Sequence, residues 1–157
     1  MNNTVQEATE LDPLDRIEKS IPIKANAEKV FDVVSRPGWW INGGDAIDTE
    51  PQLRQEGDLT VVTDPTHGEF RLQTVESDPP HYIAFRWHHR LPDDGIKRST
   101  LVQFRLEPQA DGVLLKVVES GFSRLQKPRE EWLQDRTDNT SGWELELGLA
   151  RDLAEAL

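Results

Sequence analysis

The middle of the chain is a series of short runs rich in β-branched and aromatic residues, each preceded by turn-forming residues. The runs cover residues 59–63, 69–76, 82–90, 99–107 and 113–120, and Gly, Pro and Asp dominate the turns between them. Regular turn chemistry between such runs predicts an antiparallel meander. A doubly wound parallel sheet would need strands that alternate with helices, and the chain lacks that rhythm.

The segment before these runs predicts a strand followed by helix. Arg16–Ile23 alternates apolar and polar residues, as a half-buried strand does. Pro22 suits a strand at the edge of a sheet, because it has no N–H to donate. Asn26 is a candidate N-cap for a helix, and Pro37-Gly38 is expected to end it.

The last third of the chain predicts one long helix. Residues 123–136 are charged and contain Pro128, so we expect a loop with a short helical turn there. Asp138 or Asn139 is a candidate cap for a helix that runs to Leu157 with one apolar stripe. Gly142 and Gly148 would each weaken this helix by about 1 kcal/mol, and we interpret them as positions where another surface comes close.

One face of the sheet and one stripe of the last helix need burial, and packing them together satisfies both. We therefore expect an α+β fold in which a curved antiparallel sheet of six to seven strands wraps around the long C-terminal helix. Two short helices are expected after the first strand. A curled sheet closed by one helix predicts a cavity between them. Residues 1–15 are predicted to be a disordered leader, and residues 16–157 are predicted to form a single domain.

Composition excludes several classes of function. The chain has no cysteine, so disulfides, thiolate zinc sites and cysteine nucleophiles are excluded, and a cytoplasmic location is expected. A formal net charge of -11 disfavours nucleic acid as a partner. Every apolar run is far shorter than the roughly 20 residues of a membrane helix, so no membrane insertion is expected. Both a monomer and a homodimer stay open.

The strand predicted at residues 82–90 suggests a binding site. Alternation along it places aromatic rings on the face that should turn inward, and the neighbouring strands add apolar residues. The inward set comprises Phe85, Trp87, His89, Val102, Phe104, Val117 and Glu119. Trp39, Trp40 and Trp143 complete the candidate ligand-binding residues, as lid and wall of the cavity or as plain core packing.

His89 and Glu119 are the two polar groups in this otherwise apolar lining. They are the candidate pair for orienting a ligand or exchanging a proton with it. Alternatively, both lie at the rim of the sheet with a structural role. No metal or cofactor is expected, because His88 and His89 point to opposite faces of a strand and cannot chelate one ion together.

The sequence resembles a known superfamily. RIEKSIPIKANAEKVFDVVS resembles the first strand and helix of START-like (SRPBCC) proteins, and SGWELELGLARDLAEAL resembles their helix-grip ending. Within the superfamily, the chain is most similar to proteins named after the ATPase activator of the ninety-kilodalton heat-shock chaperone. The matching features are Trp39-Trp40 after the first helix, the strand IAFRWHH, Glu119-Ser120-Gly121-Phe122, and Gly142-Trp143.

This resemblance covers residues 16–157 and implies a helix-grip domain with an internal hydrophobic cavity. The leading hypothesis is therefore that the chain binds a hydrophobic, lipid- or polyketide-like small molecule. One alternative is an enzyme of the cyclase or dehydratase type that uses the same cavity. Another is a regulator of a chaperone ATPase or a different protein-interaction module.

Overall fold

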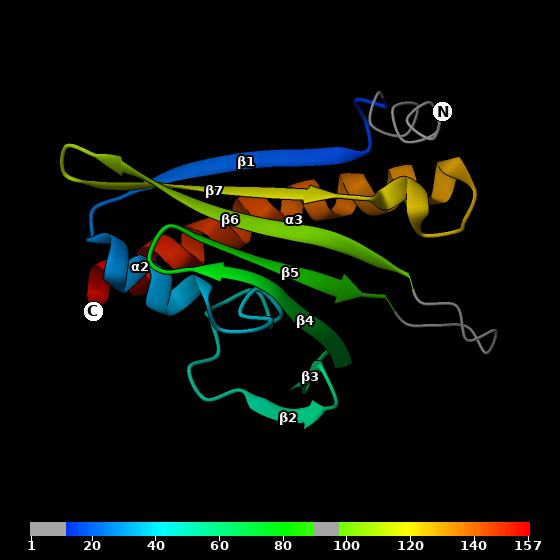
Figure 1. The fold of residues 1–157 in the computed structure, drawn as a ribbon, viewed down its shortest axis with the longest axis horizontal. Helices are drawn as coiled ribbons and strands as arrows, with labels where there is room; N and C mark the ends of the chain where they lie inside the picture. Colours follow the sequence, from blue (N-terminus) through cyan, green and yellow to red (C-terminus); the bar gives the residue numbers. More distant parts are fainter. Residues whose placement is uncertain (1–11, 90–97) are drawn as a thin grey trace.

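The computed structural model describes residues 12–89 and 98–157, which form one antiparallel sheet packed on a long helix (Figure 1). The strands are β1 (Arg16–Ile23), β2 (Gln52–Glu56), β3 (Leu59–Asp64), β4 (Gly68–Asp78), β5 (Tyr82–His88), β6 (Ser99–Gln109) and β7 (Gly112–Ser120). They form a 7-stranded sheet in the order β1-β7-β6-β5-β4-β3-β2. The predicted meander and the edge position of β1 are confirmed.

Two helices and one short 3-10 turn complete the described fold: α2 (Ala27–Val34), η1 (Phe122–Arg124) and α3 (Arg129–Ala156). The helix α3 runs along one face of the sheet, behind β7 and β6 in Figure 1. The predicted α+β helix-grip architecture is therefore confirmed. Residues 1–11 of the expected leader and the turn expected at residues 92–95 lie outside the described residues.

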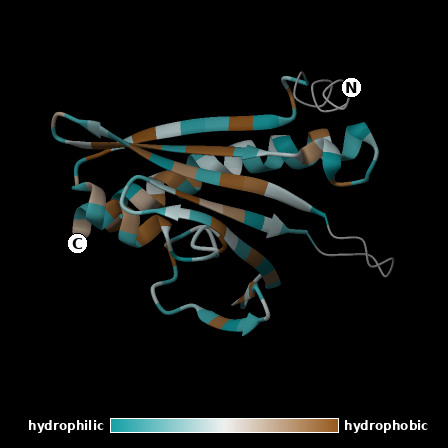
Figure 2. Ribbon diagram, in the orientation of Figure 1, coloured by the Kyte–Doolittle hydropathy of each residue, from teal (hydrophilic) through white to brown (hydrophobic). Residues whose placement is uncertain are grey.

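The alternation of the strands sets the two faces of the sheet as predicted. Figure 2 shows hydrophobic and hydrophilic bands alternating along the strands. On the face toward α3, Phe85, Val102, Phe104, Val117 and Glu119 are all fully buried. Period-two alternation thus determines which residues of each strand face the core.

The prediction of two short helices after the first strand is wrong, because the described segment between β1 and β2 contains α2 alone. Asn26 caps α2 as expected, accepting a hydrogen bond from the backbone N–H of Lys29 at 2.9 Å. After α2 the chain makes isolated turns, in which Trp39 N–H donates to the Arg36 carbonyl and Ile41 N–H to the Gly38 carbonyl. Gly38 has a φ of 69°, which breaks helical continuation.

The last helix begins earlier than predicted. It starts at Arg129 and not at Asp138 or Asn139, so most of the loop expected over residues 123–136 is helical. Burial explains the difference, since Trp132 is buried in the core and the Arg129 guanidinium lies 5.5 Å from its ring centroid. Asn139 does not cap a helix; its side chain donates instead to Glu119.

The first residues that the structure describes are anchored to the domain. Asp15, placed in the expected leader, is buried. Its carboxylate accepts hydrogen bonds from the backbone N–H and the hydroxyl of Ser123, just after β7. The Asp15 carbonyl also accepts from the N–H of Gly121. Asp15, directly before β1, is therefore packed into the domain.

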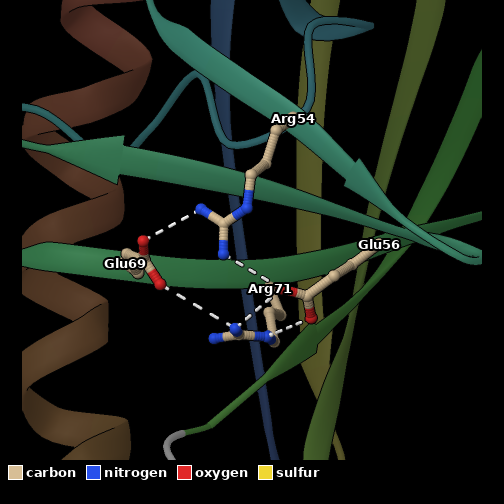
Figure 3. A network of polar contacts seen from close by, with 4 residues as sticks. All are labelled: Arg54, Glu56, Glu69 and Arg71. Atoms are coloured by element: carbon tan, nitrogen blue, oxygen red, sulfur yellow. Dashed lines mark hydrogen bonds and ion pairs between the residues drawn. The ribbon is translucent and has the colours of Figure 1, made fainter.

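An edge strand that the sequence analysis missed, β2, is held by a cross-strand network of charges (Figure 3). Arg54 donates to Glu69 at 2.9 Å and to Glu56 at 3.0 Å, and Arg71 forms two hydrogen bonds with Glu56. These side chains lie on the same face as Val61, which pairs with both Arg54 and Arg71 and is buried. The hydrogen bonds from Arg71 hold the pKa of Glu56 below its usual range.

We interpreted Gly142 and Gly148 as sites of close approach, and this interpretation is wrong. A Cβ added at either glycine would meet no heavy atom of the described chain within 4 Å, apart from its own helix. Both positions in α3 therefore border open space.

The first residue of β7, Gly112, does need to be glycine, which gives a first prediction. A Cβ on Gly112 would collide with the carbonyl oxygen of Ile23. We expect Gly112→Ala to lower the free energy of unfolding by about 3 kcal/mol, because backbone cannot move aside cheaply. Gly57→Ala is the control, with a φ of 62° but nothing near its Cβ, and it should cost about 1 kcal/mol. Equal losses in chemical denaturation would contradict the steric explanation.

Candidate functional site

Five aromatic rings pack around Trp40, which lies in the turn segment after α2. Its ring centroid is 5.5 Å from those of Trp87 and Trp143, 5.6 Å from those of Phe85 and Phe104, and 5.9 Å from that of Trp39. Such tilted and edge-on pairs stabilise a cluster beyond the effect of burial alone. The cluster lies between the sheet and α3, in the region where an internal cavity was expected.

Open space lies beside this cluster, in a pocket of about 460 Å³ that opens to solvent. Its walls come from the turn after α2, the turn before β4, the strands β4 and β5, and the middle of α3. The lining residues are Trp40, Ile41, Asn42, Gly43, Gly44, His67, Phe70, Trp87, Asn139, Gly142, Trp143, Leu145 and Glu146.

The structure brings three of the predicted binding residues to this pocket: Trp40, Trp87 and Trp143. The others are not among its lining residues. Trp39, Phe85, Val102, Phe104, Val117 and Glu119 are buried in the core, and His89 packs against Trp87 with ring centroids 5.8 Å apart. A direct role of these residues in ligand binding stays a prediction.

Glu119 joins the sheet to α3. It is fully buried, and its Oε2 lies 2.6 Å from the Thr100 hydroxyl on β6. Its Oε1 accepts hydrogen bonds from Asn139 Nδ2 at 3.0 Å and from Trp143 Nε1 at 2.9 Å, both on α3. Burial raises the pKa of Glu119, against the opposing effect of these hydrogen bonds. A protonated Glu119 would still fit, because the Thr100 hydroxyl can accept as well as donate.

His89 and Glu119 are not hydrogen-bonded to each other among the described residues. The hydrogen bonds of Glu119 go to Thr100, Asn139 and Trp143. His89 Nε2 is buried and has no hydrogen-bond partner within the described ranges. Burial lowers the pKa of His89 and so favours its neutral form. A joint role of His89 and Glu119 in orienting a ligand or exchanging a proton with it stays a prediction.

The polar side of the pocket consists of residues that sequence reasoning missed. Glu146 of α3 is buried, and its Oε1 accepts a hydrogen bond of 2.6 Å from Asn42 Nδ2. Asn42 also fixes its own turn, because its Oδ1 accepts from the N–H of Gly44 at 2.8 Å. His67 Nε2 lies 3.1 Å from the Asn42 carbonyl oxygen. Burial raises the pKa of Glu146 to about 7.

A sequence signal existed for part of this set. Asn139 precedes Trp143 by four residues and Glu146 follows it by three, so both fall within the apolar stripe of the helix. A polar residue within such a stripe is a candidate for a buried, hydrogen-bonded role. Asn42 and His67 lie in turns, where no periodicity marks their orientation.

No group of three or more His, Cys, Asp or Glu side chains among the described residues is placed to hold a metal ion. No described helix is long and apolar enough to cross a membrane.

A family model described as Activator of Hsp90 ATPase homolog 1-like protein matches residues 24–148. No curated protein matches. Among solved structures, protein MLL2253 from Mesorhizobium loti superposes with a TM-score of 0.68 at 15% identity, covering 90% of this chain and 97% of that one.

Two other solved structures share the fold. The Aha1 dimer from Colwellia psychrerythraea has a TM-score of 0.62 at 14% identity, covering 89% of this chain and 96% of that chain. DynU16, from the dynemicin biosynthetic locus, has a TM-score of 0.62 at 19% identity; 90% of this chain is covered, but only 47% of DynU16. At these identities the likeness establishes the fold alone.

The hydrogen bonds of Glu119 give a second prediction. In Glu119→Ala, Thr100 and the Trp143 indole N–H lose their buried partner, so we expect the free energy of unfolding to fall by about 3 kcal/mol. Glu119→Gln should cost about 1 kcal/mol, because an amide can accept from Trp143 and donate to Thr100. Urea denaturation at neutral pH measures both. Equal losses would contradict this explanation, because an amide of the same volume would then fail to replace the hydrogen bonds of the carboxyl group.

The raised pKa of Glu146 gives a third prediction. The ordinary value of this carboxyl is 4.5 and the folded value about 7, so the folded state holds the proton to higher pH. Its contribution to stability is complete below the unfolded pKa and is lost as the pH rises through about 7. Relative to Glu146→Gln, the wild-type free energy of unfolding should fall by about 1–2 kcal/mol between about pH 5 and pH 8, a range that allows for screening by water in the pocket.

Denaturation curves of the wild type and of Glu146→Gln across this pH range give the two free energies of unfolding. Glu119 titrates in the same direction in both proteins, so the difference between them isolates Glu146. A constant difference in stability would contradict the assignment.

Proposed function

Because this chain belongs to the family of Activator of Hsp90 ATPase homolog 1-like proteins, we propose that it binds a hydrophobic small molecule in the pocket beside α3. The observation that carries the proposal is the pocket itself, whose walls include the rings of Trp40, Phe70, Trp87 and Trp143. Apolar walls with a few convergent polar groups are the usual construction of a small-molecule site.

The size of the pocket supports this proposal. About 460 Å³ falls within the roughly 300–1,000 Å³ of known ligand sites. Leu145 at the pocket is 48% exposed, so an apolar surface extends from the lining to solvent. A lipid- or polyketide-like ligand would bury this surface. The site of the proposal is thus an open pocket at the side of the aromatic cluster.

An enzyme of the cyclase or dehydratase type is the second candidate, and Glu146 is the observation that favours it. A carboxyl with a pKa of about 7 that lines a pocket can both donate and accept a proton near neutral pH. In this version Glu146 takes the acid–base role that sequence reasoning gave to His89 and Glu119. Turnover of a bound compound that is lost in Glu146→Gln would support it.

The proposal also covers the cellular location and the oligomeric state of the chain. A cytoplasmic location would suit a chain without cysteine. A homodimer is a reasonable alternative to a monomer, since the solved relative from Colwellia psychrerythraea is a dimer. Light scattering on the purified chain distinguishes the two states.

A fourth prediction tests the pocket with a matched pair of glycines. Gly142 lines the pocket and Gly148 does not, while a Cβ at either has open space around it. Gly142→Leu should fill the pocket and weaken binding at least about tenfold, whereas Gly148→Leu should leave binding unchanged. Both variants should be up to about 1 kcal/mol more stable than the wild type, because leucine is the better helix former.

Calorimetric titration with a panel of fatty acids, flavonoids and polyketide-like aromatic compounds makes the measurement. A compound whose affinity is the same in wild type and Gly142→Leu binds elsewhere. If this holds for every compound that binds, the pocket is not the binding site.

A further inference from the structure

Within the described chain, Glu146 has no lysine or arginine partner in its pocket. Of the described residues that line the pocket none is lysine or arginine, and the only other titratable side chain is that of His67. Along α3, the residues three and four positions away from Glu146 on either side carry no charge. The hydrogen bond from Asn42 engages Oε1. Oε2 has no hydrogen-bond partner in the part of the chain that the structure describes.

A buried carboxylate without a counter-charge is costly, and proteins normally pair such a group or keep it protonated. Among the residues that the structure describes, Glu146 receives one neutral donor, the Asn42 amide, and no lysine or arginine. Burial accordingly raises the pKa of this carboxyl to about 7. A positively charged ligand group would remove this cost and favour the ionised form.

The walls of the pocket are also suited to a cation. Trp40, Trp87 and Trp143 contribute indole rings to the lining on the side of the aromatic cluster. The face of a tryptophan ring attracts an ammonium group more strongly than other side-chain rings do. The formal net charge of -11 further raises the local concentration of cations around the protein.

We propose that the pocket recognises an amine, namely a ligand with a hydrophobic body and a protonated amino group that pairs with Glu146. The amino group donates to Oε2 while Asn42 holds Oε1, and the hydrophobic body lies against the indole rings. This inference rests on the proposed function and assigns its ligand class. The same arrangement rejects carboxylates, because two like charges would then share one buried site.

Three compounds with the same ring system test the charge requirement: 1-naphthalenemethylamine, 1-naphthalenemethanol and 1-naphthoate. At about pH 8 the amine should bind roughly tenfold more tightly than the alcohol, since a hydrogen bond to a charged group exceeds a neutral one by this order. The carboxylate should bind most weakly. Isothermal titration calorimetry on the full chain gives the three affinities.

Glu146→Gln removes the charge but keeps an oxygen that can accept from Asn42. In this variant the amine and the alcohol should bind within about threefold of each other. Glu144→Gln is the matched control, because it removes an acidic residue from the same helix whose partner is Lys19 on the surface. It should keep the preference for the amine.

The pH dependence separates Glu146 from His67. Affinity for the amine should rise roughly tenfold between about pH 5 and pH 8 as Glu146 ionises. This rise should disappear in Glu146→Gln, whereas a rise caused by deprotonation of His67 would persist there. Persistence of the full rise in Glu146→Gln would overturn the assignment of the amine to Glu146.

The remaining outcomes distinguish this inference from the proposed function. Equal binding of amine and alcohol, or an amine preference that survives Glu146→Gln, overturns the inference. If the amine inference fails in this way but the alcohol binds more weakly to Gly142→Leu than to the wild type, the proposed function stands without the amine inference. Failure of all three compounds to bind overturns the amine inference, and the wider panel then decides whether the pocket binds a hydrophobic ligand at all.

Discussion

The arrangement of this fold depends on one buried carboxyl group, that of Glu119. It contacts β6 through Thr100 and α3 through Asn139 and Trp143, and it belongs to β7 itself. A sheet and a helix that met only through apolar side chains could slide or rotate with little penalty, because the hydrophobic effect has no direction. Hydrogen bonds from two positions on α3, one turn apart, fix the rotation of the helix. Asn139 and Trp143 also line the pocket, so the same carboxyl determines the shape of one pocket wall.

The turn segment after α2 plays the complementary part on the opposite wall. It inserts Trp40 among the aromatic rings of the sheet and of α3. Two residues later, Asn42 reaches Glu146 and so connects this turn to the helix a second time. The pocket is therefore bounded by a rigid cluster on one side and by a polar bridge on the other. Its walls come from segments that are far apart in the chain, and they are assembled only in the complete fold.

The sequence predicts the strands and their inward faces because alternation is a local property of extended backbone. Phe85, Phe104 and Glu119 accordingly lie where the pattern placed them. The strand β2 escaped prediction because all its residues are exposed, so no apolar alternation marks it; it pairs with β3, and its Arg54 also reaches Glu69 of β4. The early start of α3 escaped it because Pro128 and the charged residues suggested a loop, whereas burial of Trp132 outweighs them. The polar residues of the pocket are brought together by tertiary contacts, which the sequence does not display. Among them, only Glu146 and Asn139 had a periodic signal.

The ring cluster has an optical consequence. Of the 5 tryptophans, Trp39, Trp40, Trp87 and Trp143 belong to one set of touching indoles. Excitation absorbed by one indole passes readily to its neighbours at separations of 5.5–6.3 Å, so their emission and near-ultraviolet dichroism belong to the set as a whole. A change in the surroundings of any one ring is then reported by all of them. The chain carries an intrinsic spectroscopic probe whose signal comes from the wall of its own pocket.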